Sequence, residues 1–203
     1  PLRRFADRGY IFSKLIGILL LSYIAWVLSA LHVLAFSHLS LVLVLLALAL
    51  LGITLFFVQR NAIFDFVEKH WRLLLVEEVI FTAAFLLFVS VRSLNPDLFN
   101  AWRTGEKPME LAFLNAVLRS PYMPPLDPWF AGGYINYYYY GYVLFASLIK
   151  LTGIVPTTAF NLAIPTLFAL TFTGAIAIVY TLTRRITIAL LGGFFVALIG
   201  NFN

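Results

Sequence analysis

The stretch Leu39-Ser-Leu-Val-Leu-Val-Leu-Leu-Ala-Leu-Ala-Leu-Leu-Gly-Ile-Thr-Leu-Phe-Phe-Val58 contains no charged residue. A helix of about 20 apolar residues crosses the hydrocarbon core of a bilayer, so this run predicts a membrane span. Four further runs are mainly apolar: about 11–36, 73–91 (after a shorter amphipathic lead-in at 62–72), 157–182 and 186–202. The sequence therefore predicts an all-α integral-membrane protein, a polytopic helical bundle with about five spans.

The overall composition agrees with a membrane protein. The chain is 62% hydrophobic and 11% charged, whereas soluble domains contain about 25% charged residues. Its net charge is +5, but the cations lie mainly near the ends of the apolar runs, where membrane topology explains them. We therefore expect membrane lipids as partners and no nucleic acid. The start at Pro1 and the end directly after an apolar run lead us to expect a piece of a longer chain.

The positive charges predict the orientation, because Lys and Arg collect in cytoplasmic loops. They lie before the first span and between the second and third, at Arg3, Arg4, Arg8, Lys14, Arg60, Lys69 and Arg72. This pattern places the N-terminus in the cytoplasm. The chain then divides into 1–92 with three spans, an extracytoplasmic loop at 93–156, and 157–203 with two spans.

The segment 138–152 has two interpretations. If it crosses the bilayer, Arg184 and Arg185 lie outside. If it lies along the outer surface, the span at 157–182 runs inward and both arginines are cytoplasmic, which fits the charge rule better. Its opening tyrosines also favour the interface. We expect a juxtamembrane helix here, with a full crossing as the alternative.

Four of the nine acidic residues lie between 93 and 142, in a segment that ends Ala131-Gly-Gly-Tyr-Ile-Asn-Tyr-Tyr-Tyr-Tyr-Gly-Tyr142. Pro108 suits the first turn of a helix, so we expect a second juxtamembrane helix at about 108–119, with Glu110 in its first turn. Glu110 either complements the helix dipole or acts at the bilayer edge as a general base or metal ligand. Glu106, four residues earlier, is a supporting acid.

Cations flank these two acids at Arg103, Lys107 and Arg119. They either bind the phosphate of a lipid-linked substrate or contact anionic head groups. Asp127 precedes Pro128, which is typical of a turn. The aromatic residues of this segment either stack on a sugar or lipid or form an interfacial belt. The candidate binding residues here are Trp129, Asn136, Tyr137, Tyr138, Tyr139 and Tyr140.

Glu77 and Glu78 lie within the third apolar run. An intramembrane carboxylate is a candidate functional group, but these two are also close enough to the cytoplasmic end to be hydrated or to pair with Arg72. No group of His, Cys and Asp residues has the spacing of a zinc site. The cofactor stays open, with a divalent metal as one option.

The run Ile135-Asn-Tyr-Tyr-Tyr-Tyr-Gly-Tyr142 resembles the signature of a family of bacterial and archaeal integral-membrane proteins named for its tyrosine triplet, the YYY family. The resemblance extends to Gly105-Glu-Lys-Pro-Met-Glu110, Asp127-Pro-Trp129 and Phe160-Asn-Leu162. In that family the second acid of the Gly-Glu-Lys-Pro-Met motif is usually Asp, whereas this chain has Glu110. The family implies a bacterial or archaeal plasma membrane.

The YYY family is similar, more distantly, to the GT-C class of lipid-dependent glycosyltransferases. That likeness implies an essential acid at the start of a juxtamembrane helix in the first large outer loop, which is the place of Glu110. It also implies sugar transfer from a polyprenyl-phosphate carrier to an extracytoplasmic acceptor. The alternatives are a non-catalytic subunit of a larger membrane complex, and a transporter that uses Glu77 or Glu78.

Overall fold

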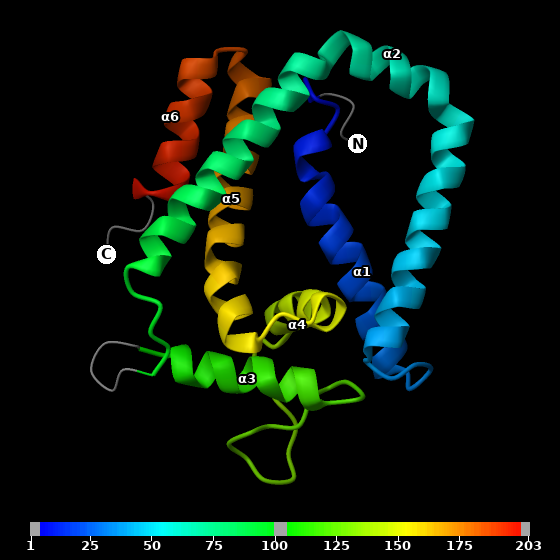
Figure 1. The fold of residues 1–203 in the computed structure, drawn as a ribbon, viewed down its shortest axis with the longest axis vertical. Coiled ribbons are helices and arrows are strands. Elements are labelled where there is room, and N and C mark those ends of the chain that lie inside the picture. Colours follow the sequence, from blue (N-terminus) through cyan, green and yellow to red (C-terminus); the bar gives the residue numbers. More distant parts are fainter. Residues whose placement is uncertain (1–4, 100–104, 200–203) are drawn as a thin grey trace. The chain divides into compact units, whose positions relative to one another are not determined.

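The computed structural model describes residues 5–99 and 105–199, and within these ranges the chain is helical. A short 3-10 turn, η2 (Tyr10–Phe12), leads into the first helix. The helices are α1 (Ser13–Ala30), α2 (His38–Ser93), α3 (Lys107–Arg119), α4 (Tyr140–Thr152), α5 (Pro156–Thr183) and α6 (Ile186–Ala197) (Figure 1). The prediction of an all-helical membrane protein is confirmed.

Three helical segments are long and apolar enough to cross a membrane: Tyr10–Ala30, α2 and α5. The 12-residue α6 is shorter than a span, and the run predicted at 186–202 extends into residues outside the described ranges. The spans predicted at 39–58 and 73–91 both lie in α2, which is a single helix of 56 residues. At 1.5 Å per residue, its axis measures roughly 84 Å, enough for two crossings and a connecting segment.

The absence of a break in α2 differs from the prediction of two helices. The reason is that residues 53–93 contain neither Gly nor Pro, the residues that end helices most effectively. The polar residues between the two apolar runs continue the helix, since Gln, Arg, Glu and Lys are good helix formers.

The first span ends earlier than predicted, at Ala30 rather than near residue 36. His32 adopts a left-handed conformation with φ 58°. Its N–H donates to the Ser29 carbonyl (3.1 Å), and the Val33 N–H donates to the Leu28 carbonyl (2.9 Å). These are the two hydrogen bonds of a Schellman motif, which closes a helix. Here His takes the position where Gly is usual.

The chain forms two compact units. The first unit combines Pro1–Ile16, Phe56–Asn95 and Leu162–Asn203. Within it, the rings of Phe88 on α2 and Phe168 on α5 stack with centroids 4.5 Å apart. A Cβ atom built on Gly193 of α6 would lie 2.7 Å from the side chain of Ile176 on α5, so the glycine permits α5 and α6 to pack closely.

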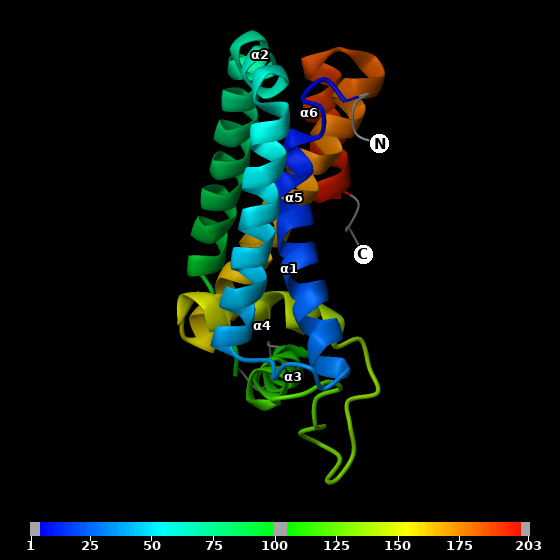
Figure 2. The same ribbon diagram turned by 90° about the vertical axis from the view of Figure 1, so that its right-hand side faces the viewer.

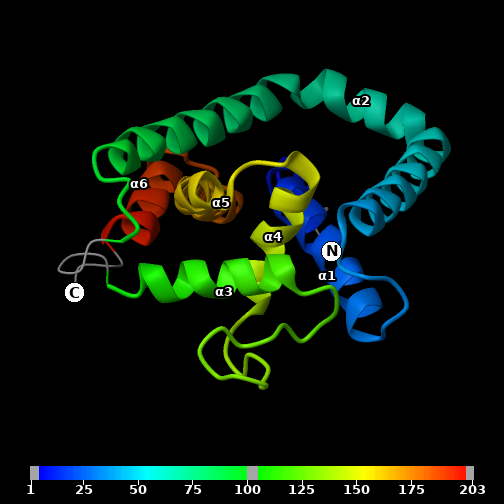
Figure 3. The ribbon, with the colours of Figure 1, turned by 60° about the horizontal axis from the view of Figure 1, so that its bottom comes forward.

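The second unit combines Gly17–Leu55 and Pro96–Asn161. Here α3 packs across α4 (Figure 3). The buried contact residues are Leu111, Leu114 and Val117 on α3, and Val143 and Ala146 on α4. The spacing on α3 places its three side chains on one face of the helix. This packing positions the charged residues of α3 discussed below.

Candidate functional site

Glu110 lies in the first turn of α3, and its side chain is partly buried. At about 100° per residue, Glu110 falls on the same side of the helix as Leu114 and Val117, which are buried in the second unit. The carboxylate therefore lies at the N-terminal end of the packed face of α3, rather than on its solvent side.

Tyr142 lies on α4, and its phenol is affected by the charge of Glu110. Burial, with the negative charge of Glu110 as the second cause, raises the pKa of the Tyr142 phenol to about 12. The ring of Tyr142 lies 6.0 Å from that of Phe113, one turn after Glu110. Tyr142 therefore stays a neutral hydrogen-bond donor at physiological pH, on the helix that faces Glu110.

Glu106 is exposed, whereas Lys107 is partly buried, as Glu110 is. Glu106 precedes α3 as its N-cap residue, makes no side-chain capping bond, and accepts the Glu110 N–H at its backbone carbonyl (3.0 Å). Lys107 opens α3, and its Nζ lies 3.4 Å from the Asp97 carbonyl. Arg103 lies outside the described residues. Glu106, Lys107 and Glu110 are thus grouped at the N-terminal end of α3.

Asp127 shapes a loop. Its Oδ1 accepts the backbone N–H groups of Trp129 (2.7 Å) and Phe130 (3.1 Å). Its own N–H donates to the Gly133 carbonyl (3.0 Å), and Gly132 supplies the positive φ of 79° that the turn requires. These bonds support the structural interpretation of Asp127, that of a turn former. The tip of this loop projects beyond α3 (Figure 2).

Arg119 and Asp127 line one groove of about 780 Å³ in the second unit. The α3 residues in its wall, Asn115 and Arg119 among them, lie on the face opposite to Glu110. Arg119 is exposed and makes no hydrogen bond or ion pair with a described residue. Its Cα lies nine residues from that of Glu110, roughly 14 Å along the helix axis. The predicted site residues are therefore divided between two faces of α3.

The side chains of the tyrosine run, Tyr137 to Tyr140, point in several directions. The Tyr139 hydroxyl accepts a hydrogen bond from Trp26 Nε1 on α1 (3.1 Å), and the Tyr140 hydroxyl lies 3.3 Å from Ser22 Oγ. The Tyr137 ring stacks near Phe113 of α3, at 6.0 Å.

A buried phenol usually finds a hydrogen-bond partner, so the sequence predicts at least one hydroxyl of the tyrosine run within reach of a polar group of 103–119. Over the described residues 105–119 the structure shows no such bond, because the hydroxyls of Tyr139 and Tyr140 lie against α1 instead.

The remaining predicted binding residues are exposed. Tyr138 is 85% exposed and Trp129 67% exposed, and Asn136 also faces solvent. Their exposed surfaces can contact a ligand or a membrane surface, although the Tyr138 ring packs edge-on against that of Tyr137, with centroids 5.0 Å apart.

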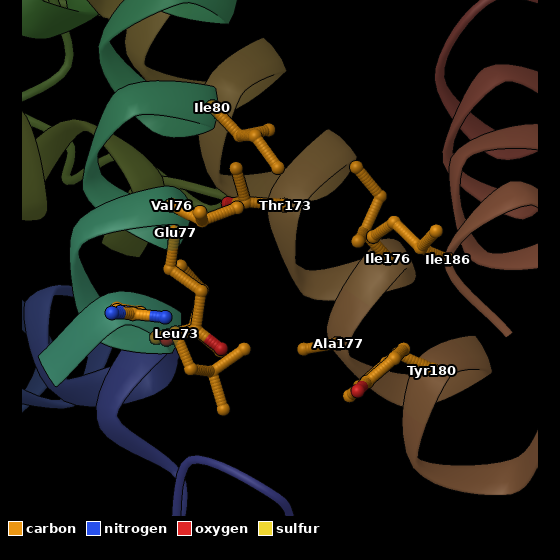
Figure 4. A pocket seen from close by; sticks show the side chains of 11 residues that line it. Leu73, Val76, Glu77, Ile80, Thr173, Ile176, Ala177, Tyr180 and Ile186 are labelled. Carbon is orange, nitrogen blue, oxygen red and sulfur yellow. The ribbon is translucent and has the colours of Figure 1, made fainter. Parts of the chain in front are cut away.

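A second candidate region lies in the first unit, where Glu77 lines a cavity of about 260 Å³ between α2 and α5. Figure 4 shows Glu77 extending from α2 into this space, which Thr173 and Tyr180 of α5 also border. Among the described residues, Glu77 Oε2 is buried without a hydrogen-bond partner. The neighbouring Glu78 pairs instead with Lys14 Nζ. The two adjacent acids therefore have different environments.

Metal binding has no ready donor set in the described part of the chain, since no three His, Cys, Asp or Glu side chains gather there. Sequence reasoning overlooked Tyr142 as a partner of Glu110, although it belongs to the tyrosine-rich run. It also overlooked Ser22 and Trp26, which gave no signal because apolar helices routinely contain such residues.

A family model described as Uncharacterized membrane protein (DUF2298) matches residues 20–203. No curated protein and no solved structure matches the chain. The family match includes α3, the loop with Asp127, the tyrosine run and α4, so the expected membership of a membrane-protein family is confirmed. The chain belongs to the uncharacterized membrane protein family DUF2298.

Proposed function

We propose that this chain is part of a GT-C-like glycosyltransferase, which moves a sugar from a polyprenyl-phosphate carrier to an extracytoplasmic acceptor. The observation that carries the proposal is the placement of Glu110. It is a partly buried carboxylate in the first turn of an amphipathic helix, and that helix packs on a second short apolar helix between two spanning segments.

In this mechanism Glu110 is the general base. Its carboxylate accepts the proton of the acceptor hydroxyl, the hydroxyl oxygen attacks the anomeric carbon of the donor sugar, and the bond from that carbon to the carrier phosphate breaks. The departing phosphate gains negative charge, which a cation stabilises. Lys107 suits this role better than Arg119, because Lys107 lies at the same end of α3 as Glu110. Glu106 adds a second negative charge at this end of α3. Tyr142, which stays neutral, is available as a hydrogen-bond donor.

The packing of the first unit supports the outer placement of this site. Phe88 contacts Phe168, while the lining of one cavity includes both Leu73 and Tyr180. The second half of α2 and α5 therefore run antiparallel, and the chain between them returns to the side that it left. If the 13-residue α4 crossed the membrane once, α5 would begin on the side opposite to the end of α2, which the antiparallel packing excludes. We infer that α3 and α4 both lie at the membrane surface, with Arg72 and Arg184 on the opposite side.

The test is sugar transfer by the full-length protein in nanodiscs, with a polyprenyl-phosphate-linked sugar as donor. Glu110→Gln keeps the shape of the side chain and removes its charge. Loss of a general base lowers rates by about 10²–10⁴-fold, so transfer should fall by that factor while expression stays normal. Glu106→Gln makes the same change in the supporting acid four residues earlier and should cost less activity than Glu110→Gln. Glu68→Gln, at an exposed position of α2 with no role in the mechanism, is the matched control and should leave transfer unchanged. Equal activity of Glu110→Gln and the unmodified protein would remove Glu110 from the mechanism.

The transporter alternative has one supporting observation, the unpaired oxygen of Glu77 in its cavity. This alternative predicts that Glu77, and not Glu110, is essential in an assay of substrate uptake. Glu77→Gln would abolish substrate uptake into proteoliposomes, and Glu110→Gln would leave it unchanged.

A further inference from the structure

A basic cavity of about 620 Å³ lies in the first unit, apart from the site on α3. Its charged lining residues are Lys69, His70 and Arg72 from α2, and Arg184 from the end of α5. No acidic residue belongs to its lining among the residues that the structure describes. The cavity thus collects like charges from two helices, an arrangement that favours an anion.

Local structure holds two of these cations in place. The guanidinium of Arg72 lies over the ring of Trp71, with Cζ 5.4 Å from the centroid. Arg184 ends α5 in a left-handed conformation with φ 55°, and its N–H donates to the Tyr180 carbonyl (2.8 Å). The arginine therefore follows the last helical turn directly.

The basic cavity adjoins the apolar cavity of Figure 4, because Arg72, Leu73 and Tyr180 line both. Beyond these shared residues the apolar cavity is walled mainly by aliphatic side chains: Ile11, Val76, Ile80, Ile176, Ala177 and Ile186. One continuous surface thus changes from cationic to hydrocarbon-like over about two helical turns of α2. A phospholipid has the same sequence of chemistry, from phosphate to acyl chain.

We propose that these two cavities form a binding site for one anionic glycerophospholipid. The lipid phosphate lies among Arg72, Arg184 and Lys69, where charge-assisted hydrogen bonds are available. One acyl chain lies against Ile176 and Ala177 between α2 and α5. Basic pockets between membrane helices bind anionic head groups by this chemistry. The site is independent of the sugar-transfer proposal, since it shares no residue with α3 or α4.

The Glu77 carboxylate favours a particular head group. Its unpartnered oxygen is a hydrogen-bond acceptor in the wall of the apolar cavity, next to the shared residues. A head group that has hydroxyl donors beside its phosphate satisfies this oxygen, and phosphatidylglycerol is such a lipid. A choline head group has no N–H or O–H donor to offer.

Lipid binding is tested by native mass spectrometry of the full chain taken from nanodiscs with equal mole fractions of phosphatidylglycerol and phosphatidylcholine. The protein should retain phosphatidylglycerol in preference. Arg184→Gln should weaken that retention roughly fivefold, as expected for the loss of one cation near a membrane surface. Arg185→Gln is the matched control, because it removes the same charge one residue away, outside both cavities.

Four outcomes would overturn the proposal. Equal retention of the two lipids by the unmodified protein would show that it has no site selective for phosphatidylglycerol, and this result needs no variant. Equal loss in Arg184→Gln and Arg185→Gln shows non-specific surface charge. A thermal shift with inorganic phosphate alone that equals the shift with phosphatidylglycerol assigns the cavity to free phosphate. A polyprenyl phosphate that displaces phosphatidylglycerol stoichiometrically would instead assign it to the carrier lipid.

Discussion

At the scale of single residues, the tyrosine run joins α4 to α1 through two hydroxyl groups. Tyr139 accepts a hydrogen bond from Trp26, and Tyr140 lies within bonding distance of Ser22. An indole N–H buried in a helix packing interface needs an acceptor. The run therefore has a structural role in two of its four members, while Tyr138 is solvent-exposed.

Tyr139→Phe should destabilise the protein, because it removes the acceptor of Trp26 Nε1 and changes little else. The loss of one such hydrogen bond costs about 1 kcal/mol, which corresponds to a fall in Tm of about 2–4 °C for a chain of this size. Thermal unfolding in detergent measures it. Tyr138→Phe, the exposed control, should leave Tm unchanged, and an equal fall in both variants would show that the Trp26 bond does not matter.

Tyr142 should make stability depend on pH at the alkaline end. Its phenol has a pKa of about 12 in the folded protein and about 10 in an unfolded chain. The folded state holds the proton more tightly, so this contribution is complete below pH of about 10 and is lost as pH rises toward about 12. Between pH of about 8 and 11, the Tm of Tyr142→Phe should therefore fall less than the Tm of the unmodified protein. Identical losses would contradict the placement of Tyr142 near Glu110.

The chemistry of α3 was predictable in part. Pro108 and the apolar pattern predicted a helix with Glu110 in its first turn, and the structure has one at Lys107–Arg119. The division of Glu110 and Arg119 between opposite faces also follows from helical geometry. The tertiary partners did not follow, because Tyr142 and Phe113 meet through the packing of α3 on α4, and no local pattern encodes that crossing.

At the scale of elements, helix ends were harder to predict than helices. The motif that ends α1 depends on a left-handed His32, a conformation that sequence rules assign to Gly or Asn. The continuity of α2 was missed for the opposite reason, since a change from apolar to charged residues suggested a boundary that the backbone does not have. Hydropathy locates spans, whereas hydrogen bonding of the backbone decides where helices stop.

α4 should lie on the outer surface without crossing. The chain contains no cysteine, so single cysteines label without background. Asn136→Cys and Val155→Cys lie on either side of α4 and should both react with a membrane-impermeant maleimide added from outside. Gln59→Cys, in the charged segment of α2, is the cytoplasmic control and should react only after permeabilisation. Labelling of positions 136 and 155 from opposite sides would show that α4 spans the bilayer.

At the scale of the whole molecule, the class of protein was the easiest prediction. A chain that is 62% hydrophobic with long uncharged runs has no soluble alternative. Membership of a membrane-protein family confirms it. The function that we propose is less accessible from sequence, because the proposal rests on a single partly buried carboxylate, Glu110. The polar residues predicted around α3 are divided between its two faces, and the cavities of the first unit add a candidate surface that the sequence did not indicate.

The central claim is that Glu110 meets the reacting sugar. The most direct measurement is a cryo-electron microscopy structure of the full-length protein in nanodiscs with a polyprenyl-phosphate-linked sugar. We predict density for the sugar beside the Glu110 carboxylate, with the phosphate near Lys107 at the same end of α3. Density for the glycolipid at another surface, with Glu110 in contact only with protein, would contradict the account.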